Sequence, residues 1–144
     1  MKLFVLLLAC FLLGCSSRHP VEDAKAVLKS HEEYAEAGNL DGVISNMADD
    51  IVGMAPGMPL VKGRDAYRAF YSNVFKMGKS EFVHEYDGAE IVGYAVILHG
   101  IGKGTLTKPD SSVVPFTNNF IIVLKYQPDG KMKVWRATFA PSSR

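Results

Sequence analysis

The chain has 144 residues, which is enough for one domain with a sizeable core and too few for two. Apolar residues make up 48% of the chain and charged residues 22%, as in ordinary globular proteins. The 16 basic and 15 acidic side chains nearly cancel, and no basic stripe is interleaved with aromatic residues. These features exclude nucleic acid as an expected partner.

Residues 1–14 have the pattern of a secretory signal peptide. Lys2 gives a positive start, and the apolar run Leu3–Leu13 is too short to span a bilayer as a mature helix. The run ends in Leu-Leu-Gly-Cys, which is similar to the lipobox of bacterial lipoproteins and makes Cys15 the lipid site. The alternative is an ordinary signal peptide or an uncleaved anchor with a chance cysteine. We therefore expect a lipid-anchored protein in which residues 15–20 form a polar tether.

Cysteine usage is consistent with this interpretation. Cys10 leaves with the signal peptide and Cys15 takes the lipid, so the domain keeps no thiol for a disulfide, a zinc cluster or a nucleophile. No two histidines have metal-ligand spacing, so neither a metal nor a cofactor is expected. Ser16 and Ser17 stand where inner-membrane lipoproteins of enterobacteria carry aspartate. By this resemblance, the periplasmic side of the outer membrane is the favoured location in the bacterial envelope.

Three helices are predicted before nearly all of the strands. Apolar residues recur at helical spacing from Val21 to Ala35, and Gly38 ends this segment as a left-handed cap. A short helix is expected at Gly42–Met47, with Asp41 as its N-cap. Ala66–Met77 is expected to form a third helix with a broad aromatic side.

Strands dominate the rest of the chain. A short strand is predicted at Ile51–Ala55, and residues 56–63 form a loop rich in proline and glycine. Two long strands, Glu81–Val92 and Tyr94–Leu106, turn near Gly93. Helices that precede an antiparallel sheet indicate an α+β fold, with the helices on one face of the sheet.

The last 26 residues before the C-terminal tail form the clearest element, a hairpin over Phe116–Pro141. Two runs rich in β-branched and aromatic residues are joined by Gln-Pro-Asp-Gly at 127–130, which suits a tight turn. Both runs carry apolar residues on both faces, so both faces of the sheet need a cover. The helices supply one cover. A second copy of the chain or curling of the sheet supplies the other.

Several motifs are similar to the SnoaL-like and ketosteroid isomerase-like branch of the nuclear transport factor 2-like superfamily. They are the segment DGVISNMADD at 41–50, Val61–Ala66 leading into Phe70, and Asp129–Val134. The resemblance spans nearly all of residues 21–141. It implies a cone-shaped fold, in which a strongly bent antiparallel sheet wraps around three N-terminal helices. It also implies an apolar pocket in the mouth of the cone and, often, a dimer through the outer face of the sheet.

The resemblance implies less about activity. Isomerase-like members use a carboxylate as a proton shuttle, with a tyrosine and a protonated acid as donors to the oxyanion. No such set can be identified in this sequence, so no catalytic residue is assigned. Asp49 and Asp50 match an acidic motif before the first strand, and we interpret them as structural.

The histidines are weighed one by one. His99 lies on an apolar strand face and is either a general base or a hydrogen-bonded core residue, and the second interpretation is favoured. His84 also lies in a strand. His31 lies on the packing stripe of the first helix and could face a pocket, whereas Glu32 and Glu33 are expected to be solvated.

The glycine-rich segment Gly100–Gly104 superficially resembles a phosphate-binding loop. It lies inside a predicted strand and opens no helix. We therefore interpret its glycines as sites where the sheet bends or bulges.

Strict alternation along the last strand predicts where its charged residue points. Arg136 shares a face with Met132 and Val134, and in relatives this face corresponds to the pocket side. Arg136 then either pairs with a buried acid, Glu85 or Glu90, or binds an anionic ligand. The ion pair is the favoured alternative.

These considerations define a candidate pocket and a candidate interface. The pocket wall is expected to include Tyr34, Phe70, His99 and Arg136. The opposite face of the last strand, with Trp135, Ala137 and Phe139, is expected to form a homodimer interface.

Three classes of function are compatible with the sequence. The first is a lipid-anchored module that binds a small, mostly apolar molecule, which could be acidic. The second is an isomerase, dehydratase or cyclase that uses the same cavity. The third is a non-catalytic assembly module that dimerises through its sheet. The missing acid–base set favours the first class.

Overall fold

The computed structural model describes residues 19–142, so the predicted signal peptide and Cys15 lie outside the described residues. The elements in chain order are α1 (Pro20–Glu36), α2 (Leu40–Ser45), β1 (Met47–Met54), β2 (Val61–Lys62), α3 (Arg64–Met77), β3 (Lys79–Val92), β4 (Ala95–Thr107), β5 (Val113–Tyr126) and β6 (Met132–Pro141). Within residues 19–142, no helix combines the length and the apolar character needed to cross a membrane.

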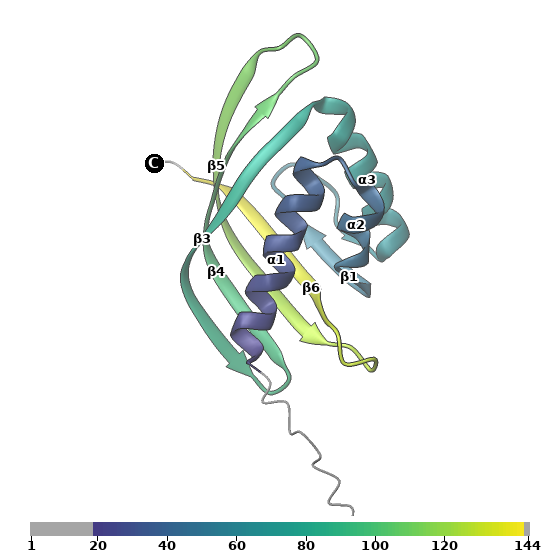
Figure 1. The fold of residues 1–144 in the computed structure, drawn as a ribbon, viewed down its shortest axis with the longest axis vertical. Helices are drawn as coiled ribbons and strands as arrows, with labels where there is room; N and C mark the ends of the chain where they lie inside the picture. Colours follow the sequence, from purple (N-terminus) through teal and green to yellow (C-terminus); the bar gives the residue numbers. More distant parts are fainter. Residues whose placement is uncertain (1–18, 143–144) are drawn as a thin grey trace, which may run out of the picture.

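The strands form one six-stranded sheet in the order β2-β1-β6-β5-β4-β3. The sheet bends strongly, and all three helices lie on its concave side (Figure 1). The predicted α+β cone is therefore confirmed. One pair, β1 with β6, is parallel rather than antiparallel. This pairing is possible because a helix and four strands separate β1 from β6 in the chain, so the connection is long enough for a crossover.

The helix starts differ from the prediction by one or two residues. The side chain of Asn39 caps α2 by accepting a hydrogen bond from the Gly42 amide at 2.9 Å. Asp41, the predicted cap, instead pairs with Arg68 of α3 at 2.7 Å. Asparagine and aspartate cap helices about equally well, so the choice of Asp41 by residue type alone was wrong, and the tertiary contact with Arg68 explains why.

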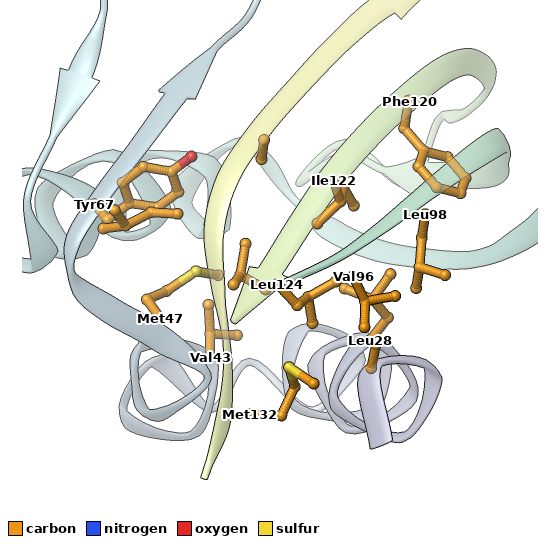
Figure 2. Close-up of a cluster of buried hydrophobic side chains, with 14 of the residues drawn as sticks. Leu28, Val43, Met47, Tyr67, Val96, Leu98, Phe120, Ile122, Leu124 and Met132 are labelled. Atoms are coloured by element: carbon orange, nitrogen blue, oxygen red, sulfur yellow. The ribbon is translucent and has the colours of Figure 1, made fainter. Parts of the chain in front are cut away.

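The core lies between the helices and the concave face of the sheet. Leu28 of α1 and Val43 of α2 are fully buried, as are Leu98 of β4 and Leu124 of β5. Figure 2 shows these side chains converging, with Leu28 directed at the strands that carry Leu98 and Leu124. Each such side chain contributes about 1.5–3 kcal/mol by leaving water. This contact holds α1 across the sheet and thereby positions the residues of its middle turns.

Strand β6 contains a β-bulge that the sequence prediction missed. Val134 lies opposite Leu124, but Val123, the neighbour of Leu124 in β5, lies opposite Arg136 and not opposite Trp135. Trp135 is therefore an extra residue, and it reverses the alternation of every residue that follows. The prediction that Arg136 points into the cone is wrong for this reason.

The bulge also redistributes the predicted interface residues. Ala137 pairs with buried Ile122 and is itself buried, and Phe139 pairs with buried Phe120. Both therefore face the helices, and only Trp135 of the three stays on the outer face. The prediction of a shared outer surface for these residues is wrong.

Candidate functional site

An apolar cavity of about 230 Å³ lies between α1, α3 and the inner face of the sheet. An apolar cavity of about 150 Å³ is enough to hold benzene, so this one has room for a ring with substituents. Its apolar wall is largely aromatic, with Phe70, Phe75, Phe82, Phe116 and Phe139 among its residues. The polar lining residues within the described chain are His31, Tyr67, Tyr71, Ser80, His84 and Asn118, and none of the lining residues is Lys, Arg, Asp or Glu. The cavity therefore offers neutral polar groups on an apolar background.

His31 and Tyr71 form the first polar pair of the wall. The Tyr71 hydroxyl lies 2.9 Å from Nε2 of His31, and the two rings meet edge to face. Burial, together with a smaller electrostatic effect of the nearby His84, lowers the pKa of His31 to about 4. Burial likewise raises the pKa of Tyr71. Both groups are consequently neutral near pH 7.

One hydrogen-bond donor of the His31–Tyr71 pair has no acceptor among the described residues. Nδ1 of His31 is buried and has no partner among the described residues. If Tyr71 donates to Nε2, then Nδ1–H is the unused donor. If Nε2–H donates to Tyr71, the phenolic O–H is the unused donor. In both tautomers the protein leaves a donor unsatisfied, which is rare for buried groups and leaves this donor able to bind a ligand or a water molecule.

His84 and Glu32 form the second polar pair. Oε1 of Glu32 accepts from the His84 amide at 2.9 Å and lies 2.8 Å from Nδ1 of the same ring. With Glu32 as a carboxylate, Oε1 accepts both bonds, so Nδ1 carries the ring proton and Nε2 keeps its lone pair. Burial lowers the pKa of His84, although the hydrogen bond that His84 donates to Glu32 and the charge of that carboxylate oppose this shift. His84 lines the cavity and is held there as a neutral base with a defined tautomer.

The burial of Glu32 is a correction to the sequence prediction. Glu32 is only 7% exposed, although its neighbour Glu33 points to solvent. Lys29 lies one turn earlier in α1, and its ammonium is 3.5 Å from the other carboxylate oxygen of Glu32. Helical spacing put Glu32 beside the packing stripe, and only the partner on β3, 52 residues away, explains why it is buried.

Of the four predicted pocket residues, one lines the cavity and three do not. Phe70 lines the cavity. Tyr34 packs its ring against Gly42 of α2 and is not among the lining residues. His99 pairs with Ile121, which is 51% exposed, and its ring lies over Gly88 on the outer face of the sheet. The prediction that His99 lines the cavity is therefore wrong.

Arg136 has structural partners on the outer face. Its Nη1 donates to the carbonyl oxygens of Asp50 at 2.9 Å and of Trp135 at 2.7 Å. Its guanidinium also lies 4.0 Å from the centre of the Trp135 ring. Glu85, one of the two predicted partners, instead pairs with Lys103 at 2.6 Å. Arg136 therefore neither binds a buried acid nor reaches the cavity.

The two aspartates inside β1, Asp49 and Asp50, make outward contacts. Asp49 pairs with Arg64 at 2.8 Å. Asp50 accepts from Nε1 of Trp135 at 2.8 Å and from Lys125 at 3.2 Å. Slight burial raises the pKa of Asp50, but these two hydrogen bonds outweigh it and leave the pKa below its usual value. The contacts agree with the structural interpretation of both residues.

The glycines of β4 allow close approach between strands. A Cβ on Gly100 would lie 2.0 Å from the carbonyl oxygen of Glu85, next to the bulge between Tyr86 and Gly88. Gly102 belongs to the cavity wall. These positions bend the sheet around the site and do not form a phosphate-binding loop.

The family of the chain follows from a match over most of this architecture. The family model described as the SnoaL-like domain matches residues 28–135, a range that includes both histidine pairs. The chain belongs to the SnoaL-like family. No curated protein is similar enough in sequence to count as a relative of the chain.

Solved structures share the fold of this SnoaL-like protein at low sequence identity. A ketosteroid isomerase-like protein from Erwinia carotovora atroseptica has a TM-score of 0.78 and 19% identity, over 88% of this chain and 99% of that one. A candidate dehydratase of the NTF2-like family from Streptomyces avermitilis has a TM-score of 0.77 and 17% identity, over 87% and 98%. A candidate aromatic ring hydroxylase from Novosphingobium aromaticivorans has a TM-score of 0.74 and 18% identity, over 88% and 94%. These similarities show the cone fold, and the site must indicate the chemistry.

Proposed function

We propose that this SnoaL-like protein is anchored to the bacterial envelope through Cys15 and binds one small, neutral, mostly apolar molecule in its cone. The observation that carries the proposal is the unused donor of the His31–Tyr71 pair in the wall of an apolar cavity. A buried polar group without a partner costs about 1–3 kcal/mol. An oxygen atom of the ligand would remove this cost while the rest of the ligand fills the apolar space.

The polarity of the wall supports a neutral ligand rather than an acid. The lining residues include no lysine or arginine, and Arg136 lies on the other face of the sheet. A carboxylate would lose its hydration in the cavity without gaining a cationic partner. A ketone or an alcohol would lose much less hydration free energy, and its oxygen could accept a hydrogen bond from the unused donor.

A binding titration tests the choice of ligand class. Calorimetry would compare cyclic ketones with the carboxylic acids of the same ring. We expect the double variant His31→Phe/Tyr71→Phe, which removes the unused donor whichever residue carries it, to weaken binding of the ketone by about five- to tenfold, which corresponds to one hydrogen bond. Arg136→Met is the control and should leave the affinity unchanged. The proposal would be refuted if the acid bound more tightly than the ketone. It would also be refuted if Arg136→Met lost affinity for the acid.

The anchor is tested separately. Cys15→Ala should abolish metabolic labelling by a palmitate analogue and leave the precursor uncleaved. Continued labelling of this variant would contradict the lipid anchor and would leave the ligand proposal untouched.

The His84–Glu32 pair favours a second candidate function, an isomerase, dehydratase or cyclase acting in the same cavity. Nε2 of His84 could take a proton from the carbon next to a ligand carbonyl, and Glu32 would stabilise the resulting imidazolium. The unused donor of the His31–Tyr71 pair could bind the carbonyl oxygen as negative charge develops on it. The proton would return from Nε2–H to another atom of the same molecule, so an isomerisation needs no co-reactant.

Proton exchange distinguishes catalysis from binding alone. The α-protons of a bound ketone would be followed by NMR in deuterated water. Catalysis predicts exchange with the wild-type protein and at least a hundredfold slower exchange with His84→Gln, while calorimetry still detects binding. His99→Gln, on the outer face, is the matched control and should exchange normally. Equal rates with His84→Gln and the wild type would exclude His84 as the base.

A further inference from the structure

The turn between β3 and β4 exposes three large apolar side chains. Ile91, Val92 and Tyr94 are 57%, 58% and 77% exposed, and Gly93 between them makes the turn with φ 61°. We call residues 91–94 the hairpin tip. Such a cluster at the end of a strand pair adds nothing to the core, and exposed apolar clusters usually mark a contact surface.

The hairpin tip lies at the end of the domain where the chain enters it. Ala95, the first residue of β4, pairs with Lys125 of β5. The next residue, Tyr126, donates a short hydrogen bond to Asp23 in the first turn of α1. Figure 1 shows the same arrangement, with the β3–β4 turn beside the start of α1. The tip and the N-terminal end of the domain are therefore neighbours.

The tether between this end and the proposed lipid site is short. Only residues 16–18 separate Cys15 from His19, the first described residue. Four residue steps reach at most about 14 Å even when fully extended. A lipid on Cys15 would hold the start of α1, and the hairpin tip with it, close to the bilayer surface.

We propose that the hairpin tip is a membrane-docking surface that inserts into the boundary between lipid headgroups and acyl chains. The proposal rests on the lipid anchor at Cys15. Tyrosine is enriched at this boundary because its ring is apolar and its hydroxyl is polar, and Ile91 and Val92 suit the acyl side. The anchor raises the effective concentration of the tip at the membrane, so even a weak contact is populated.

Docking at the tip would set the orientation of the cavity. Ser80 and Phe82 line the cavity near the start of β3, whereas the tip includes the last two residues of the strand, Ile91 and Val92. The 12 residue steps from Ser80 to Val92 span up to about 40 Å of strand. The cavity would then lie away from the bilayer, and the protein would take its ligand from the aqueous compartment rather than from the lipid.

Site-specific fluorescence on the lipidated full-length chain tests the proposal. Tyr94→Cys would be labelled with an environment-sensitive fluorophore and bound to vesicles of phosphatidylethanolamine and phosphatidylglycerol. The matched control is Lys108→Cys, in the turn at the other end of β4. Signal cleavage removes Cys10 and acylation blocks Cys15, so the new cysteine is the sole free thiol. We expect blue-shifted emission, with at least twofold quenching by doxyl lipids, at position 94 and neither effect at position 108.

The possible failures are distinguishable. If the chain does not float with the vesicles, the lipid anchor is wrong and the docking proposal falls with it. If it floats and position 94 behaves like position 108, the anchor stands and the docking proposal is overturned. A blue shift at position 94 without quenching by doxyl lipids would also overturn it, because the tip would then be covered by protein.

Discussion

The two faces of the sheet use the same kinds of side chain in opposite ways. On the inner side, His31 of α1 and His84 of β3 are buried, and burial lowers the pKa of each so that both stay neutral. On the outer face, Arg136 stacks on Trp135, and Lys103 pairs with Glu85 while both side chains stay about half exposed. Polar groups on the inner face are costly to leave unpaired, whereas solvent screens those outside. An unused hydrogen-bond donor on the inner side therefore points to a binding site, whereas one on the outer face does not.

The largest expected contrast comes from removing one carboxylate on each side of the sheet, Glu32 of α1 on the inner side and Glu85 of β3 on the outer face. Glu32→Ala leaves the His84 amide and Nδ1 without their acceptor and should lower the free energy of unfolding by about 4 kcal/mol. Glu85→Ala breaks an exposed pair and should cost no more than about 1 kcal/mol. Urea denaturation measures both, and equal losses would contradict the difference between the faces.

The pH dependence of stability should report the burial of His31. Its pKa is about 4 in the folded protein and about 6.5 when unfolded, so the unfolded chain binds more protons between these values. Stability is then fully present above pH 6.5 and falls by about 3 kcal/mol as the pH drops to 4. His84 adds a loss of the same sign, because burial lowers its pKa too.

The contribution of His31 can be isolated by comparison with His31→Phe. This variant keeps an aromatic ring but cannot titrate, so its loss of stability between pH 6.5 and pH 4 should be smaller than that of the wild type. Thermal or urea unfolding across this range would measure the difference. Identical pH profiles would mean that His31 is not buried as a neutral ring.

A smaller effect is expected from Arg136→Met on the outer face. The substitution removes stacking on Trp135 and two hydrogen bonds to carbonyl oxygens and should cost about 1 kcal/mol. A loss of several kcal/mol would be expected only if Arg136 held a buried acid. Thermal denaturation of this variant therefore checks whether Arg136 lies on the outer face, as the β-bulge at Trp135 implies.

The smallest effect on stability concerns assembly. We still expect a homodimer through the outer face, now around Ile121 and Val83, which are 51% and 50% exposed, with Trp135 nearby. Ile121→Glu should shift a dimer toward monomer in sedimentation and change the stability of the monomer by less than about 0.5 kcal/mol. A wild-type domain that is monomeric at tens of micromolar would contradict this prediction.

The elements could be predicted because their determinants are local. The helical spacing over 21–35, the capping glycine at Gly38 and the Pro-Asp-Gly turn of the last hairpin each depend on neighbouring residues, and the structure has the corresponding elements. The order of helices and strands then pointed to the α+β cone. The apolar residues on both sheet faces predicted a cover for each face; the helices cover the concave face, and a cover for the outer face stays a prediction.

The candidate site was predicted only in part, because its geometry depends on contacts between distant residues. One extra residue at Trp135 moved Arg136 out of the cone and brought Ala137 and Phe139 into it. A bulge forms when the partner strand and the bend of the sheet favour it, and alternation along one strand cannot show this. His31 was noted as a residue that could face a pocket, but its partner Tyr71 comes from another helix.

The sequence by itself determined the three helices, the long strands, the family and the apolar character of the interior, since these follow from periodicity, turn residues and motifs along the chain; it missed the short strand β2 at Val61–Lys62, which lies in the predicted loop. Only the tertiary structure decided which polar groups meet. Glu32 looks like a solvated helix residue until His84, 52 residues later, is placed against it. The physical reason is that burial and hydrogen bonding belong to pairs of groups in space, so the protonation state of a side chain is set by its surroundings and not by its own position in the sequence.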